Sequence, residues 1–238
     1  MVPRAGADAP PARAYTRAMP PGPRNTRTSL RSTRGRSTAS QRWLSRQLND
    51  PYVKAAKAAG WRSRAAFKLI ELDDRFGLIT PGCRVVDLGA APGGWTQVAL
   101  RRGGPAARVV GLDLLEMEPI PGATLLRGDF QEEAAEAAVR AALDGPADLV
   151  LSDMAPNTTG HTATDHLRIM ALAELALDFA LKVLRPGGAF VAKLFQGGAE
   201  REMLARLRRH FAEVRHAKPP ASRKESAETY VVATGFRP

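Results

Sequence analysis

Short apolar runs alternate with longer amphipathic stretches over most of the chain. From Cys83 onward, runs rich in Val and Leu are bounded by Gly, Pro or Asp, a pattern that predicts strands. The predicted strands are 83–88, 108–113, 123–127, 148–153, 189–194 and 229–234. The stretches between them have helical spacing and predict helices at 94–101, 131–143, 164–184 and 200–210. Strands that alternate with helices predict an α/β fold with a mostly parallel sheet covered on both faces.

A different pattern precedes the first predicted strand. A short amphipathic stretch begins at Gln41 and ends before Pro51. The spacing then predicts a helix with Ser63 as its N-cap, which runs to about Phe76 and stops at Gly77. We expect the buried stripe of this helix to consist of Ala66, Leu69 and Ile70.

Residues 1–40 contain eight arginines, one acidic residue and six prolines, with few large aliphatic side chains. Such a segment cannot bury enough apolar surface to offset the entropy lost on ordering, so we predict a disordered basic extension. We expect residues 41–238 to form a single domain whose first part, 41–76, is helical and binds RNA.

The formal net charge of +11 is distributed unevenly along the chain. Residues 1–40 contribute +7, residues 41–70 contribute +6, and residues 71–238 contribute −2. A basic excess at one end indicates a polyanionic partner, either a nucleic acid or an anionic membrane surface, because such contacts release counterions.

Several classes of site and location are disfavoured by composition. One cysteine, Cys83, excludes an internal disulfide, and the four histidines lack metal-ligand spacing, so we expect no metal site. No apolar run approaches the roughly 18 residues of a membrane helix, so we expect no membrane association. The Arg-rich leader shares its composition with mitochondrial transit peptides, but without a cleavage signal we favour a bacterial cytoplasm.

Candidate chemistry begins where the first predicted strand ends. The sequence DLGAAPGGW, residues 87–95, leads directly into a helix. Its glycines allow close backbone approach, and the helix N-terminus offers free N–H groups. The loop matches neither GxGxxG nor GxxxxGK, and a tight turn without a ligand is the alternative interpretation.

Carboxylates follow the next two predicted strands. Asp113 lies 24 residues after Gly89, close to the spacing at which an acidic residue reaches a ribose diol. Asp129 is placed to accept a hydrogen bond from an adenine amino group, although either aspartate alone is typical of a turn or an N-cap. Together with the loop, they favour a ligand with an adenosine and a positive charge but no phosphate, as in S-adenosylmethionine.

The later strands add a second set of charged residues. Asp153 ends the fourth predicted strand, and Lys193 lies inside the apolar fifth, where a lysine is costly unless it has a partner or a function. A lysine that reaches water from an edge strand is the alternative. Lys68 and Glu228 look like ordinary surface residues, and sequence spacing alone cannot place them at the site.

Five blocks of sequence resemble the FtsJ/RrmJ family of ribosomal RNA ribose 2'-O-methyltransferases. In chain order they are RSRAAFKLIELDDRFGLI, DLGAAPGGW, SDMAPN, VAKLFQGG and SAETYVVATGF. The likeness covers roughly residues 35–237, and the order of the five blocks makes it specific.

The resemblance implies a Rossmann-like methyltransferase fold with a seven-stranded sheet. It also implies S-adenosylmethionine as cofactor and methylation of a ribose 2'-hydroxyl in large-subunit (23S) ribosomal RNA, at a uridine of the A loop, late in ribosome assembly. The implied catalytic tetrad is Lys68, Asp153, Lys193 and Glu228. The implied cofactor contacts are Gly93, Trp95, Asp113, Asp129 and Asp153.

Two roles remain open for Lys193 in such a reaction. A nearby cation and desolvation favour the neutral amine, which would act as general base, whereas Asp153 and Glu228 oppose that change. A charged Lys193 would instead steer the hydroxyl and stabilise a developing alkoxide.

Two functions also remain open. The first is a monomeric enzyme that acts on the assembling large subunit. The second is a basic RNA-binding assembly factor that keeps the methyltransferase fold. The intact tetrad favours the enzyme. Arg62 and Arg64, close to Lys68 in sequence, are expected to hold RNA phosphates, and the leader is expected to act as an electrostatic tether.

Overall fold

The computed structural model describes residues 38–156, 161–195 and 200–238. The chain divides into two compact units, Met1–Pro51 and Tyr52–Pro238. In the first unit, helix α1 (Thr38–Asn49) begins before the predicted start at Gln41. The rest of the predicted disordered extension lies outside the described residues, and the expected start of the domain at Gln41 stays a prediction.

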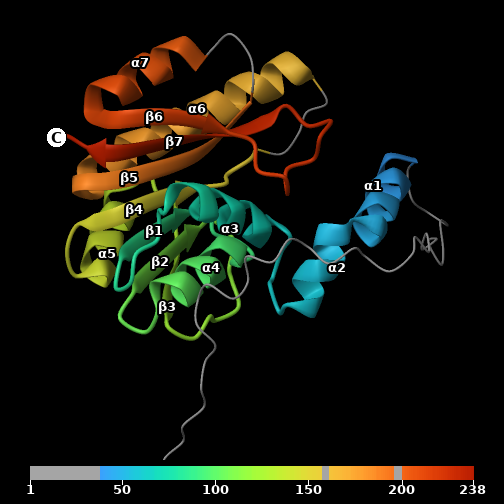
Figure 1. The fold of residues 1–238 in the computed structure, drawn as a ribbon, viewed down its shortest axis with the longest axis horizontal. Coiled ribbons are helices and arrows are strands. Elements are labelled where there is room, and N and C mark those ends of the chain that lie inside the picture. The colour runs from blue at the N-terminus through green and yellow to red at the C-terminus, as the bar shows by residue number, and fades with distance from the viewer. Residues whose placement is uncertain (1–37, 157–160, 196–199) are drawn as a thin grey trace, which may run out of the picture. The chain divides into compact units, whose positions relative to one another are not determined.

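The second unit contains a seven-stranded sheet within the described residues, with strand order β3-β2-β1-β4-β5-β7-β6 (Figure 1). The neighbours from β3 to β5 run parallel, whereas β7 is antiparallel to both β5 and β6. This topology confirms the predicted α/β fold with a mostly parallel sheet. The strands are β1 (Arg84–Leu88), β2 (Arg108–Asp113), β3 (Ala123–Arg127), β4 (Ala147–Ser152), β5 (Leu184–Phe195), β6 (Phe211–Ala217) and β7 (Glu228–Phe236).

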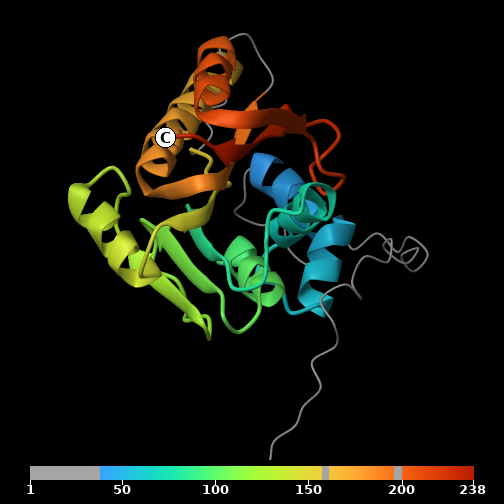
Figure 2. The same ribbon diagram turned by 60° about the vertical axis from the view of Figure 1, so that its left-hand side comes forward.

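Helices cover both faces of this sheet, as Figure 2 shows. One face packs against α3 (Ala65–Phe76) and α4 (Gly94–Gly103). The other face packs against α5 (Glu133–Leu143), α6 (Thr162–Val183) and α7 (Glu200–His210). Helix α2 (Pro51–Ala58) precedes α3 in the chain.

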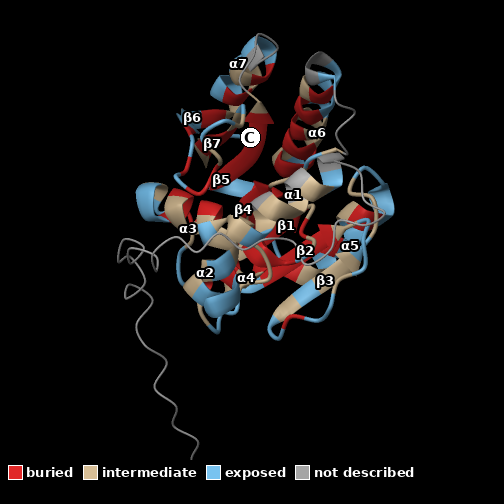
Figure 3. Cartoon of the chain, turned by 90° about the vertical axis from the view of Figure 1, so that its right-hand side faces the viewer, coloured by how far each residue is buried: buried red, intermediate tan, exposed pale blue. Residues whose placement is uncertain are grey.

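Two apolar clusters, one on each face, form the core. The central strands supply both, because successive side chains of a strand point to opposite faces. Val86 and Leu88 of β1 join the α5–α6 cluster, whereas Val85 joins the α3–α4 cluster. Figure 3 shows that the central strands are buried almost throughout, which explains why their sequences read as continuous apolar runs.

Helix α3 differs from the prediction at its start but not at its end. Its N-cap is Arg64, with helical dihedral angles and no side-chain cap, so the prediction of Ser63 as N-cap is wrong. Ile70 is only half-buried, whereas Ala66 and Leu69 are buried as predicted. Gly77 ends the helix as predicted, with φ 62° and its N–H donating to Asp73 O.

Two elements were not anticipated from the apolar pattern. Helix α2 follows Asp50 directly, where the sequence indicated only a boundary. Strand β6 is an edge strand in which only Phe211 and Ala217 are buried, and polar residues, among them Glu213 and Arg215, break the apolar run between them. Charged, exposed edge strands carry little apolar signal, which is why the pattern did not reveal it.

Candidate active site

The candidate site residues of the later strands meet at one edge of the sheet. Asp153 directly follows β4, and Lys193 lies near the end of the parallel strand β5. Glu228 is the first residue of β7, which runs antiparallel and pairs its Glu228 with Phe195 at the end of β5. The start of β7 therefore lies beside the carboxyl ends of the parallel strands, where open α/β sheets bind their ligands.

Asp153 and Lys193 form the first half of the candidate tetrad. Lys193 Nζ donates to the backbone O of Asp153 at 2.7 Å and to its Oδ1 at 3.0 Å. The Lys193 side chain is only 7% exposed, so it is a partnered buried lysine and not one that reaches water from an edge. This resolves the alternative that the sequence left open.

Lys68 reaches the same site from helix α3. Its Nζ donates to Glu228 Oε2 at 2.9 Å and lies 3.5 Å from Asp153 Oδ2. The side chains of Lys68 and Glu228 are 11% and 14% exposed, so the expectation that they are ordinary surface residues is wrong. Packing of α3 on the sheet buries Lys68, which no local pattern in the sequence could reveal.

Tyr230 is a member of the cluster that sequence reasoning missed. Its hydroxyl donates to Asp153 Oδ1 at 2.6 Å and accepts a hydrogen bond from Lys68 Nζ at 3.0 Å. The residue is completely buried and lies in the run TYVVAT, which reads as an ordinary core strand. Ser222 adds a further contact, because its Oγ donates to Glu228 Oε1 at 2.8 Å.

Two cations and two carboxylates thus share a largely dry site. Burial by itself raises the pKa of Asp153, but the positive charges of Lys193 and Lys68 and the hydrogen bond from Tyr230 outweigh it and hold this pKa below its ordinary value. Burial and the adjacent charges of Asp153 and Glu228 raise the pKa of Tyr230 well above its ordinary value. Asp153 is therefore ionised and Tyr230 neutral at physiological pH.

The glycine loop after β1 is shaped by its own neighbours. Gly89 has φ +70°, and a Cβ there would lie 2.3 Å from Met154 Cγ. Gly93 has φ +105°, and a Cβ there would lie 2.5 Å from Ile120 Cδ1. The positive φ favours glycine at both positions, and a side chain at either would also have to displace its neighbour, Met154 or Ile120.

Asp113 ties the glycine loop to the segment that follows β2. Its Oδ2 accepts from the backbone N–H of Ala91 at 2.9 Å, and its Oδ1 accepts from that of Leu115 at 2.8 Å. Each carboxylate oxygen retains a second lone pair, which can accept a hydroxyl of a ribose diol. Leu114 and Leu115, 63% and 66% exposed, provide apolar surface beside this carboxylate. A carboxylate with adjacent apolar surface fits the sugar and base of a nucleoside.

The other predicted cofactor residues have clear structural roles. Asp129 accepts a hydrogen bond from Gln131 N–H at 3.0 Å, the turn geometry given above as its alternative role. Trp95 is buried, and its indole N–H donates to Ala65 O at 2.8 Å. Its side chain therefore packs between α4 and α3. Its backbone N–H lies in the first turn of α4, where amides have no acceptor within the helix and can donate to a ligand.

Asp87 lies in β1, one residue before the strand ends, and opens the DLGAAPGGW block. It is 1% exposed, and its Oδ2 accepts from Thr96 Oγ1 at 2.7 Å. Burial raises the pKa of Asp87 to about 7, because the hydrogen bond from Thr96 offsets only part of the desolvation and the charge of Asp153 adds to it. The hydrogen bond from Thr96, in the first turn of α4, links Asp87 to the start of that helix.

Other classes of site find little support in the part of the chain that the structure describes. No cluster of three or more His, Cys, Asp or Glu residues suited to a metal ion occurs there. None of the described helices is long and apolar enough to cross a membrane. The histidines lie before or in α6 (His161, His166), at the end of α7 (His210) and in β6 (His216).

Comparison with known proteins gives consistent results. The sequence model of the FtsJ-like methyltransferases matches residues 61–236. Two bacterial proteins named ribosomal RNA large subunit methyltransferase E are similar over most of their length. The protein of Granulibacter bethesdensis is 67% identical over 92% of this chain and 94% of its own, and that of Acidiphilium cryptum is 70% identical over 90% and 95%.

A solved structure supports the same relationship. The crystal structure of a ribosomal RNA methyltransferase from Plasmodium falciparum superimposes with a TM-score of 0.66 and 29% sequence identity. The match covers 74% of this chain and 98% of the other.

Proposed function

Because the chain belongs to the FtsJ-like methyltransferase family, we propose that it methylates a ribose 2'-hydroxyl of large-subunit (23S) ribosomal RNA. The proposed methyl donor is S-adenosylmethionine, and the proposed target is a uridine of the A loop. The observation that carries the proposal is the cluster of Lys68, Asp153, Lys193 and Glu228. Four separate segments of the chain deliver these residues to one edge of the sheet, in direct contact with each other.

The proposed cofactor residues are Gly93, Trp95, Asp113, Asp129 and Asp153. When bound, S-adenosylmethionine supplies an electrophilic methyl group on a positively charged sulfur. The chain's own residues have to hold the ribose in position and take up or stabilise the charge of its hydroxyl. The anionic Asp153 suits a cationic ligand as well as the two lysines.

The hydrogen bonds distinguish the two lysines. Lys68 is surrounded by Glu228, Tyr230 and Asp153, which together can accept all three protons of its ammonium group. Lys193 donates to two acceptors, both on Asp153. Two donated bonds leave a neutral lysine amine with its lone pair and a charged one with a third N–H. We therefore assign to Lys193 the contact with the 2'-hydroxyl, and to Lys68 the orientation of Asp153 and Glu228.

The proposed setting follows from the relatives. The relatives come from bacteria and are named for methylation of large-subunit ribosomal RNA, and we propose that this chain acts in a bacterial cytoplasm on the assembling large subunit. We propose that the chain works as a monomer, since the tetrad is complete within one chain.

Lys193→Ala tests the proposal most directly. Loss of a positioned general base or of an alkoxide-stabilising cation typically costs at least about a hundredfold in rate. We expect the variant to lose methyl transfer from radiolabelled S-adenosylmethionine to ribosomal particles and free ribosomal RNA, while it still binds the cofactor. Mapping the labelled nucleotide in the wild-type reaction tests the uridine and the 2'-position.

Lys182→Ala is the matched control. Lys182 is an exposed lysine near the end of α6 that pairs with Glu136, far in the sequence from the tetrad. Its variant should methylate as the wild type does. Wild-type turnover by Lys193→Ala would refute the assigned role, and failure of the wild-type protein to methylate any ribosomal RNA would favour the RNA-binding assembly factor.

A further inference from the structure

Arg62 connects the two segments that flank Asp113. It precedes α3, and its guanidinium donates to three backbone carbonyls. Nη1 donates to Pro92 O at 3.2 Å and to Glu118 O at 2.7 Å, and Nη2 donates to Pro119 O at 2.8 Å. Pro92 belongs to the glycine loop after β1, whereas Glu118 and Pro119 belong to the segment after β2. One side chain therefore bridges both segments.

The position of Arg62 is fixed by two further contacts. Its backbone N–H donates to Gln97 Oε1 of α4 at 2.8 Å, and Gln97 Nε2 donates to Gly60 O at 3.2 Å. Its aliphatic chain packs on the glycine loop, since a Cβ at Gly93 would lie 3.3 Å from Arg62 Cδ. The backbone of Arg62 is thus anchored to α4, and its side chain lies against the glycine loop.

Asp113 joins the same two segments at a second point. Its carboxylate accepts from Ala91 N–H of the glycine loop and from Leu115 N–H of the following segment. A cavity of about 600 Å³ opens between the segments, with Arg62, Ala91, Pro92 and residues 115–118 in its wall. The spacing of the two segments therefore depends on Arg62 as well as on Asp113.

We propose that Arg62 is a positioning residue for the cofactor: it sets the distance between the glycine loop and the segment after β2 before the cofactor binds. A planar guanidinium can donate to several carbonyls in fixed directions, which the single ammonium of a lysine cannot reproduce. The sequence favoured a contact between Arg62 and RNA phosphates. In the structure its guanidinium donates three hydrogen bonds to the protein's own backbone, and we assign it the positioning role on that ground. The inference rests on the proposed use of S-adenosylmethionine.

Arg62→Lys separates the two roles, because it keeps the positive charge and loses the bridge. We expect the dissociation constant of S-adenosylmethionine, measured by calorimetry on the free full-length protein, to rise about tenfold. The KM for RNA and its dependence on salt should stay close to wild type, since the charge is retained. Arg62→Met should weaken cofactor binding to the same extent, and unfolding in urea checks that both variants are folded.

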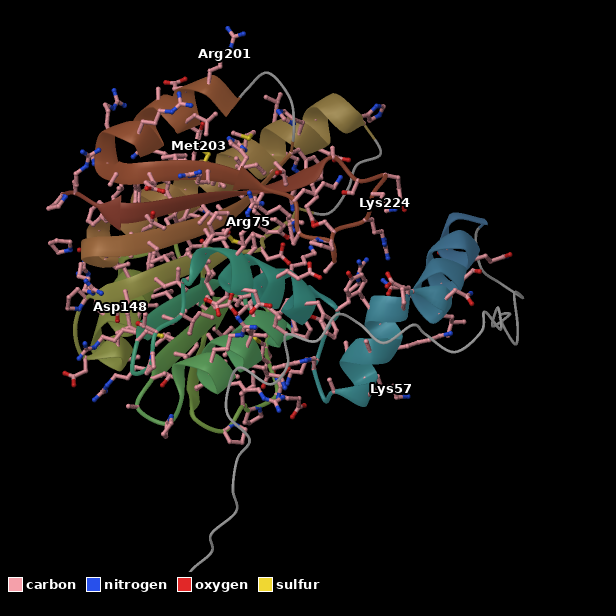
Figure 4. All side chains as sticks on the ribbon, viewed as in Figure 1. Lys57, Arg75, Asp148, Arg201, Met203 and Lys224 are labelled. Atoms are coloured by element: carbon pink, nitrogen blue, oxygen red, sulfur yellow. The ribbon has the colours of Figure 1, made fainter. Side chains whose placement is uncertain are left out.

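Arg75→Met is the matched control. Arg75, labelled in Figure 4, is an exposed arginine in the last turn of α3. Its guanidinium lies over the ring of Phe76, 4.9 Å from the centroid. Its variant should bind the cofactor with wild-type affinity. The inference is overturned if folded Arg62→Lys and Arg62→Met bind S-adenosylmethionine within twofold of wild type. If the wild-type protein itself does not bind S-adenosylmethionine, the proposed function fails, and the inference with it.

Discussion

Removal of the Tyr230 hydroxyl tests how much the hydrogen bonds around the tetrad contribute to the stability of the protein. Tyr230→Phe removes a single oxygen atom and leaves the buried ring, which lies 5.7 Å from the ring of Trp95, in place. The change deletes one hydrogen bond to Asp153 and one from Lys68. Both partners are charged and nearly dry, so each lost bond matters more than one at the surface.

The size of the effect follows from what the partners retain. A hydrogen bond to a charged group contributes about 1.5–3 kcal/mol. Asp153 keeps its bond from Lys193, and Lys68 keeps its bond to Glu228, so neither charge is left alone. We therefore expect the free energy of unfolding to fall by about 2–3 kcal/mol, close to the value of one such bond and below the sum of two.

Equilibrium unfolding in urea at neutral pH measures this difference, with Tyr52→Phe as the matched control. The Tyr52 hydroxyl donates to Glu71 Oε1 at 3.3 Å in a partly exposed position, so its loss should cost less than about 1 kcal/mol. If Tyr230→Phe destabilises the protein no more than Tyr52→Phe, the Tyr230 hydroxyl does not hold the tetrad together, and the reasoning is refuted.

Two further predictions concern the buried carboxylate of Asp87 and the basic leader. Burial raises the pKa of Asp87 from its ordinary value of 3.8 to about 7 in the folded protein, so this residue makes the free energy of unfolding fall as pH rises between those values. Asp87→Asn should therefore gain stability relative to wild type between pH 5 and pH 8 in urea titrations, by roughly 2–3 kcal/mol over that range, and a pH-independent difference would contradict the raised pKa. Deletion of residues 1–35 should weaken RNA binding and its salt dependence in filter-binding assays while methylation persists at saturating RNA, and complete loss of activity would show that the leader is more than a tether.

The sequence allowed most of the fold to be predicted because its central strands are buried on both faces. β1 and β2 read as apolar runs for this reason, and Gly77 marked the end of α3 by its left-handed conformation. β6 was not predicted because five of its seven residues are not buried, so its sequence shows no continuous apolar run. Local pattern is informative only where burial is periodic or continuous.

The site was predictable in part, for a different reason. The residues at strand ends were found by their position, whereas the proximity of Lys68 and Glu228 to Asp153 is a product of tertiary packing and was accessible only through family resemblance. Tyr230 was hidden because an aromatic residue in an apolar strand looks like core. The hydrogen bonds of Arg62 were not predictable either, because nothing local in the sequence shows that its guanidinium donates to three backbone carbonyls.

The reversed direction of β7 brings the segment between β6 and β7 to the tetrad from the side of the sheet opposite to the glycine loop. Strands β1 to β3 carry Asp113 and the glycine loop, whereas Glu228 and the segment between β6 and β7 belong to a hairpin at the other side of the sheet. That segment, residues 218–227, leads into the tetrad at Glu228 without passing through the glycine loop. A substitution at Ser222 in that segment would therefore act on the tetrad directly, since its Oγ donates to Glu228 Oε1, while the hydrogen bonds of Asp113 to the glycine loop lie on other strands and stay in place.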